Sequence, residues 1–148
     1  MEFLCEYKRN FMFETYIDNL NYENRKTVSR FRLSNHNLPI EKLRYENIKK
    51  EDRLCEICNL HNVGNENHYM LECQSNDMKD IRENFVQEAI KLVPQLSLLD
   101  ETNVIKYCLI MADRNLQYLT AVYIKNILNT YKLINESKIN EEYIKIFM

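Results

Sequence analysis

Residues 55–73 read CEICNLHNVGNENHYMLEC, and this stretch brings four metal-ligating side chains close together in the sequence. Their spacing is Cys55-x2-Cys58-x9-His68-x4-Cys73. Three thiolates and one imidazole complete the tetrahedral shell of a structural Zn²⁺ site, and a complete shell leaves no position for water or substrate. The spacing therefore predicts a zinc ion that stabilises the fold and takes no part in catalysis.

One alternative ligand lies inside the same stretch. His61 follows Cys58 by three residues and could take the place of His68. A histidine and a cysteine five positions apart can close a metal shell from the start of a helix, so the pairing of His68 with Cys73 is the better pattern. Reduced cysteines that bind no metal are the other interpretation of these residues.

The composition favours helices. The chain has 148 residues, of which only one is glycine (Gly64) and two are prolines (Pro39 and Pro94). So few turn-forming residues argue against an all-β sandwich. We expect a mostly α fold, a helical domain with a small CCHC-type zinc module near the middle. Its parts would be N-terminal helices with a basic segment (1–52), the zinc module (53–75) and a C-terminal helical bundle (76–148), in one compact unit.

Apolar periodicity and capping residues place the expected helices. Helical spacing occurs within residues 8–20, 21–34, 76–94, 100–112 and 115–134. Asn21, Asp100 and either Asn76 or Asp77 are the expected caps. A short helix carrying His68 and Cys73 could be capped by Asn65 or Asn67. Residues 36–45, which Pro39 interrupts, are expected to be extended or irregular, and residues 141–148 to form a last turn or a frayed end.

The sequence also bears on the compartment. It has no run of about 18 apolar residues, so we expect no transmembrane helix and no membrane partner. The first six residues, MEFLCE, carry charges too early for a secretory signal. Five cysteines, three of them in the metal pattern, fit an intracellular, reducing compartment, either nucleus or cytoplasm. Cys108, in the apolar run 104–111, is expected to be a small core residue.

Basic residues are concentrated in one segment. Residues 25–53 hold nine Lys and Arg against four Asp and Glu, a charge of +5, and the remainder holds eleven against eighteen, a charge of −7. This split suggests either one face for an anionic partner or a local fluctuation on a solvated surface. Four of the basic residues fall within about half the circumference of the expected helix 21–34, namely Arg25, Lys26, Arg30 and Arg32. We expect this basic face to point to solvent, away from Phe31.

Several motifs in residues 20–130 resemble one known family. RFRLSNHNLPIE (30–41) is followed by Arg44-Tyr45, then by Arg53-x-Cys55-x2-Cys58 and Glu66-x-His68-Tyr69-x2-Glu72-Cys73. Their order and spacing resemble the C-terminal zinc-binding segment of reverse transcriptases from non-LTR (LINE-like) retrotransposons. There an R-x-R-x-S-x-H-x-L-x-I-E-x-G-R-Y block precedes a C-x2-C…E-x-H-x4-C cluster. Leu43 stands where the family has a glycine, and Gly64-Asn65 replaces an acidic pair.

The resemblance implies a module that contacts RNA or DNA. It assigns phosphate contacts to Arg25, Lys26, Arg30, Arg32, Arg44 and Arg53. Tyr45 and Tyr69 could stack on unpaired bases or pack against the zinc module. The sequence has no Tyr-x-Asp-Asp polymerase pair and no endonuclease carboxylate cluster, so we expect no enzyme activity. The rest of a reverse transcriptase is a candidate partner. The alternative function is a zinc-stapled helical structural or protein–protein interaction domain that binds no nucleic acid.

Overall fold

The structure is a computed structural model that describes residues 14–98 and 102–147. Its helical segments follow one another as α2 (Tyr16–Asn19), α3 (Tyr22–Arg32), α4 (Pro39–Lys42), η1 (Lys50–Asp52), η2 (His68–Glu72), α5 (Asn76–Leu92), η3 (Pro94–Leu98), α6 (Asn103–Ala112), η4 (Arg114–Leu116) and α7 (Gln117–Phe147). Within the described ranges the only β pairing is one antiparallel bridge between Leu54 and Val63. The predicted mostly α fold class is confirmed.

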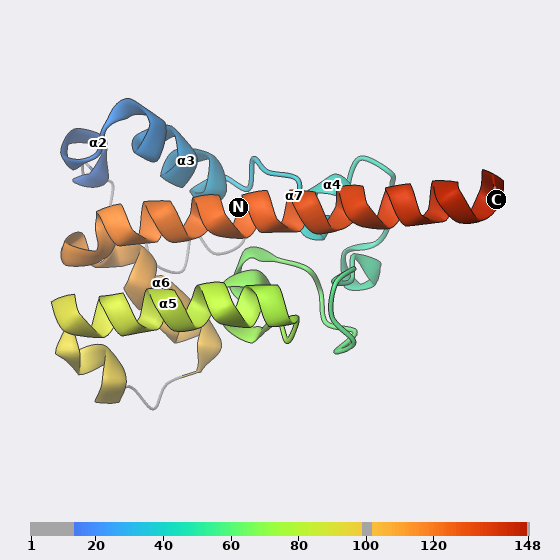
Figure 1. The fold of residues 1–148 in the computed structure, drawn as a ribbon. Helices are drawn as coiled ribbons and strands as arrows, with labels where there is room; N and C mark the ends of the chain where they lie inside the picture. Colours follow the sequence, from blue (N-terminus) through green and yellow to red (C-terminus); the bar gives the residue numbers. More distant parts are fainter. Residues whose placement is uncertain (1–13, 99–101, 148) are drawn as a thin grey trace.

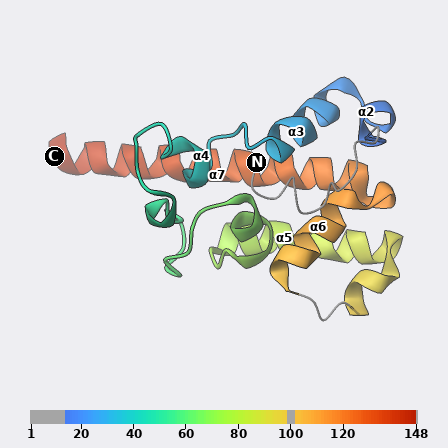
Figure 2. The same ribbon diagram turned by 180° about the vertical axis from the view of Figure 1, so that it is seen from behind.

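Helix α7 forms the long axis of the molecule (Figures 1 and 2). Helix α3 packs along one side of its N-terminal half and α5 along the other, while α6 packs against α7 and η2. Phe85 of α5 stacks on Tyr123 of α7 with ring centroids 4.2 Å apart. Val28 and Phe31 bury the inner face of α3, as the periodicity predicts. The core therefore lies around the N-terminal half of α7.

Polar side chains cap the helix starts and so supply acceptors for otherwise unpaired N–H groups. The Asn21 side chain accepts a hydrogen bond from the N–H of Asn24 (2.9 Å) at the start of α3, as predicted. Ser75 caps α5 in place of the two residues predicted to do so. Thr102 caps α6. The predicted cap Asp100 lies outside the described residues.

Two elements differ from the expectation near the N-terminus. Residues 36–45 are not wholly irregular, because Pro39 begins the short helix α4, where its fixed φ suits the first helical position. Of the helix expected over residues 8–20, the structure describes the part from residue 14 onward, which forms only α2. Residues 8–13 lie outside the described part of the chain.

Helix α7 is longer than predicted, since it continues to Phe147 rather than ending near residue 134. No glycine or proline follows Pro94 to stop it. Lys132 and Glu136 also pair across one turn, with Nζ 3.8 Å from Oε1. Residues 132–147 of α7 contain no buried side chain and project beyond the core in Figure 1. Among the described residues, none of the helices combines the length and apolar character needed to cross a bilayer.

Candidate metal centre

Cys55 and Cys58 lie on one tight loop next to the bridge between Leu54 and Val63. The N–H of Cys55 donates to the carbonyl of Asn62 (2.8 Å), which closes the loop. The backbone at His61 is left-handed, with φ of 54°, and its side chain is exposed. The closed loop lets both sulfurs turn toward one point.

His68 and Cys73 mark the start and the end of a widened helical turn, the π-helix η2. The N–H of Cys73 donates to the carbonyl of His68 (2.7 Å). This hydrogen bond joins residues five positions apart, so the side chains of His68 and Cys73 lie on the same side of the turn. In an ordinary α-helix, residues five apart point to different sides. Asn65 caps this turn by accepting a hydrogen bond from the N–H of His68 (2.8 Å). Of the two predicted caps, Asn65 is the correct one.

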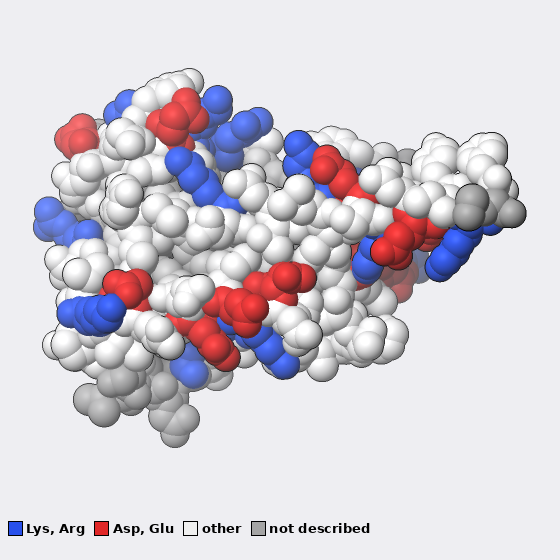
Figure 3. Space-filling model, viewed as in Figure 1, with Lys and Arg blue, Asp and Glu red and all other residues white. Residues whose placement is uncertain are grey.

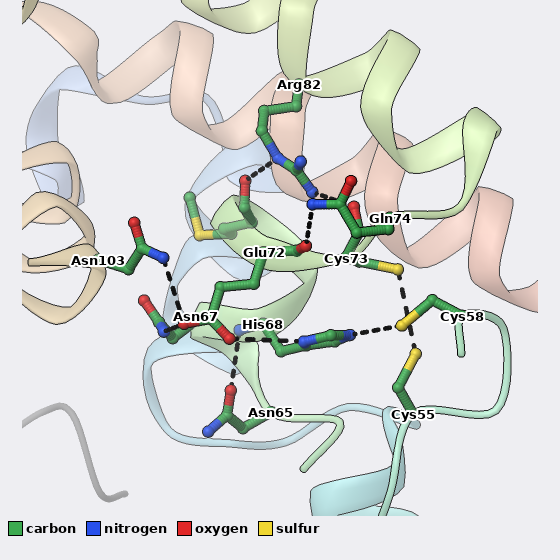
Figure 4. A network of polar contacts seen from close by, with 11 residues as sticks. Cys55, Cys58, Asn65, Asn67, His68, Glu72, Cys73, Gln74, Arg82 and Asn103 are labelled. Carbon is green, nitrogen blue, oxygen red and sulfur yellow. Dashed lines mark hydrogen bonds and ion pairs between the residues drawn. The ribbon is translucent and has the colours of Figure 1, made fainter. Parts of the chain in front are cut away.

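The four predicted ligands meet in space (Figure 4). Their ligand atoms all lie within 4.8 Å of one another, and Cys55, His68 and Cys73 are buried. The sulfurs of Cys55 and Cys73 are 4.0 Å apart, and the sulfur of Cys58 lies 3.4 Å from Nε2 of His68. The cluster could therefore hold a metal ion. His61, the alternative ligand, is not part of it.

The two thiols that touch differ in acidity. The contact with Cys73 lowers the pKa of the Cys55 thiol to about 3, against the opposing effect of burial. The same contact, together with burial, raises the pKa of Cys73. Metal ligation requires thiolates, so binding of a cation here would release the protons that these thiols carry.

A carboxylate faces the nitrogen of His68 that points away from the cysteines. Nδ1 of His68 lies 3.5 Å from Oε2 of Glu72. The other carboxylate oxygen of Glu72 accepts hydrogen bonds from Asn67 (2.9 Å) and from Asn103 of α6 (3.4 Å). At this distance and alignment Nδ1 of His68 makes no hydrogen bond with any described residue, while Nε2 faces the cysteines.

Helices α5 and α7 hold the π-helix in position. Arg82 of α5 donates to the carbonyls of Met70 (3.0 Å) and Cys73 (2.7 Å) (Figure 4). Tyr123 of α7 also donates to the carbonyl of Met70. These donors satisfy carbonyls near the end of the turn, where backbone acceptors lack helical partners. The sequence pattern gave no sign of this role for Arg82, because its partners are backbone atoms.

Glu66 joins the metal module to the segment after α3. Its Oε1 accepts hydrogen bonds from Ser34 Oγ (2.7 Å) and His36 Nε2 (2.8 Å). The N–H of Leu38 points to Nδ1 of His36 (3.3 Å), which leaves the proton on Nε2. Burial disfavours the Glu66 carboxylate, but the hydrogen bonds from His36 and Ser34 outweigh it and lower the pKa of Glu66. Three residues of the family-like motifs therefore have a structural role.

Arg32, predicted to contact phosphate, is buried. Its guanidinium contacts Oε1 of Glu14 (3.2 Å) and the carbonyl of Met111 (3.2 Å), and it lies 5.1 Å from the ring centre of Tyr16. The expectation that Arg32 faces solvent is therefore wrong. Arg32 is the last residue of α3, where the end of α6 covers it, and a helical wheel contains no information about such a neighbour.

Two more predicted contact residues bind backbone carbonyls. Arg25 donates to the carbonyl of Ile17 (2.6 Å), and Arg53 donates to those of Ile48 (2.9 Å) and Ile40 (3.0 Å). Both side chains are half-buried. Arg25 therefore joins α3 to α2, and Arg53 joins the start of the metal module to α4 and the loop after it.

The other three predicted contact residues are exposed. Lys26 and Arg30 lie one turn apart on α3. Arg44 pairs with Glu41 (3.1 Å) and donates to the hydroxyl of Tyr45 (3.2 Å), whose side chain is 78% exposed. Tyr45 is thus available at the surface.

Tyr69 is fully buried and packs edge-on against His68, with ring centroids 5.2 Å apart. Burial raises the pKa of its hydroxyl. Of its two predicted roles, Tyr69 takes the one of packing against the metal module.

A groove of about 470 Å³ runs between α3 and α7. We call it the α3–α7 groove, and it is lined by Glu23, Lys26, Thr27, Arg30, Asn35, His36, Asn37, Leu128, Asn129, Tyr131, Lys132, Asn135, Glu136 and Ile139. In Figure 3, basic side chains are prominent over α3 with acidic ones beside them, and both acidic and basic side chains lie over α5.

No family model, no curated protein and no solved structure matches this chain. The resemblance to retrotransposon reverse transcriptases therefore stays a prediction from the sequence motifs.

Proposed function

We propose that the chain is a zinc-stabilised nucleic-acid-binding module that corresponds to the post-polymerase C-terminal region of a non-LTR retrotransposon reverse transcriptase. In this proposal it contacts RNA or DNA backbones through Lys and Arg and performs no catalysis. The rest of a reverse transcriptase is a candidate partner, in the nucleus or the cytoplasm.

The geometry of the cysteine–histidine cluster supports zinc as its metal. With Zn–S near 2.3 Å and Zn–N near 2.0–2.1 Å, a tetrahedral ion separates two sulfurs by about 3.8 Å and a sulfur from a nitrogen by about 3.6 Å. The corresponding distances here are 4.0 Å and 3.4 Å. Bound zinc would fix the loop of Cys55 to the turn of Cys73 and would be coordinatively saturated, which suits a structural role.

The observation that carries nucleic-acid binding is the placement of cations on both walls of the α3–α7 groove. Lys26 and Arg30 come from α3, and Lys132 comes from α7. All three side chains are exposed. Lysines and arginines on opposite walls can neutralise successive phosphates of a strand that lies between them. Arg25, Arg32 and Arg53 would contribute indirectly, by holding the scaffold.

The test is a titration of labelled RNA and DNA oligonucleotides with the full chain in the presence of zinc, followed by fluorescence anisotropy at about 50 mM and 200 mM salt. We expect binding that weakens as salt rises. The double variant K26Q/R30Q should reduce the logarithmic salt slope by about 1.4 for single strands, because two phosphate contacts are lost. K91Q on α5 is the control, since Lys91 is exposed but pairs with Glu88 (2.6 Å) away from the groove. Absence of binding at low salt would refute the proposal.

One observation favours the alternative, a protein–protein interaction domain. Ile139, Tyr143, Ile146 and Phe147 recur at helical spacing on the projecting end of α7 and are each at least half exposed. An exposed apolar face of this kind fits a helix-in-groove contact with a protein partner. Three results together would favour this function. Light scattering would show that the protein is an oligomer, the double variant I139S/Y143S would be a monomer, and the protein would bind no nucleic acid.

A further inference from the structure

We infer that the α3–α7 groove accepts unpaired nucleotides, so that the ligand is a single strand or a loop and not a double helix. This inference rests on the proposed function and specifies its ligand. Three properties of the groove carry it: its size, the amides on its walls and the small number of its cations.

The size of the groove suits one strand. Its volume of about 470 Å³ lies in the range of pockets that take small-molecule ligands, roughly 300–1,000 Å³. A single nucleotide fits such a space, whereas a base pair with its two backbones does not. Helices α3 and α7 pack against each other and form the two walls. Widening the groove for a duplex would therefore disrupt packing around the core.

The walls of the groove carry amide side chains that a base lying in it would contact. Asn35 follows α3 on one wall, and Asn129 and Asn135 project from α7 on the other. An asparagine amide offers both a donor and an acceptor, which are the groups that pair with the Watson–Crick edge of a base. Asn135 already hydrogen-bonds with the side chain of Tyr131, so Asn35 and Asn129 are the amides assigned to base contacts. In a duplex those edges are already paired, whereas unpaired bases expose them. Leu128 and Ile139, which also line the groove, offer apolar contact to the face of a base.

The charge of the groove is also too small for a duplex. Only Lys26, Arg30 and Lys132 supply cationic side chains among its lining residues, and Glu23 and Glu136 oppose them. A protein that neutralises about 6–10 phosphates of duplex DNA needs correspondingly many cationic side chains, and the groove offers far fewer. Three cations are enough to guide one strand when base contacts add to the affinity.

The experiment compares matched ligands on the zinc-loaded full chain. A labelled single strand of about 12 nucleotides, as RNA and as DNA, is titrated alone and after annealing to its complement. We expect the single strand to bind at least about tenfold more tightly than the duplex. Equal or tighter duplex binding would overturn the inference and leave the proposed function standing. No binding of either ligand would remove both.

Substitutions locate the contact. N35A/N129A should weaken single-strand binding by about thirtyfold or more, because it removes two base contacts that are worth about 1–3 kcal/mol each. Its salt slope should stay unchanged, because no phosphate contact is lost. N126A is the matched control, since Asn126 is an exposed residue of α7 that does not line the groove. An equal loss in N126A, with unchanged melting temperatures for all variants, would overturn the inference.

Discussion

His36 and Glu66 meet inside the protein although they are 30 residues apart in the sequence, with Nε2 of His36 2.8 Å from Oε1 of Glu66. His36 belongs to the segment after α3, and Glu66 lies in the first turn of the helix that carries His68. Both side chains are nearly inaccessible to solvent, at 1% and 5% exposure. Their contact therefore joins the metal module to the segment that follows α3, and α3 forms one wall of the groove.

We expect Glu66→Gln to destabilise the protein. The glutamine amide carries no charge, so the hydrogen bonds from His36 and Ser34 are no longer charge-assisted. The substitution also buries an N–H donor at a place where the structure offers it no acceptor. The free energy of unfolding in urea should fall by about 1–3 kcal/mol. Glu83→Gln, at an exposed position of α5, should stay within about 0.5 kcal/mol of the parent. Equal losses in both variants would contradict this role of Glu66.

Gly64 should tolerate no side chain, because a Cβ at this position would lie 2.8 Å from Cγ of Pro39. The N–H of Ile40 also donates to the carbonyl of Gly64 (3.1 Å), so the two segments cannot easily separate. We expect G64A to lower the free energy of unfolding by about 1–3 kcal/mol. A double-mutant cycle with P39A is the check, since removing the ring should make the second substitution less costly. Strict additivity would show that the close approach is not the cause.

Metal content should depend on His68 and not on His61. The purified protein should hold about one zinc per chain by elemental analysis. H68A should bind less zinc and lose several kcal/mol of stability, because the metal-binding energy contributes to folding. H61A should retain its zinc, since His61 is exposed and lies outside the cluster. The corresponding cysteine control is Cys108→Ser. This variant should also retain its zinc, because Cys108 packs against the core and lies outside the cluster.

Arg30 and Arg32, two residues apart on α3, should give opposite phenotypes. R32Q should cost about 3 kcal/mol of stability, because it leaves the buried contacts to Glu14 and Met111 without a cation. R30Q should leave the melting temperature unchanged and weaken nucleic-acid binding, since Arg30 is exposed at the groove. If R32Q melts like the parent while losing binding, Arg32 is a contact residue after all.

Local chemistry in the sequence determined the fold class, the start of α3 at Asn21 and the set of possible metal ligands. Capping and periodicity depend on neighbours within one or two helical turns, so they are readable without knowledge of the fold. The spacing of the cysteines limits where one ion can gather them, so the motif indicates Cys55, Cys58, Cys73 and one histidine. The sequence favours His68 over His61, and the structure places His68 in the cluster. The predicted end of α7, near residue 134, is too early, although the sequence after Pro94 has no glycine or proline that would stop a helix.

Only the tertiary structure decided which basic residues face solvent. Arg25, Arg30, Arg32 and Arg53 have the same chemistry, and their difference arises from neighbours distant in the sequence. The carbonyl of Met111, for example, lies 79 residues from Arg32. Likewise, the α3–α7 groove exists because two helices nearly a hundred residues apart pack side by side. Such long-range contacts depend on how all helices share one core, and no local pattern contains that information.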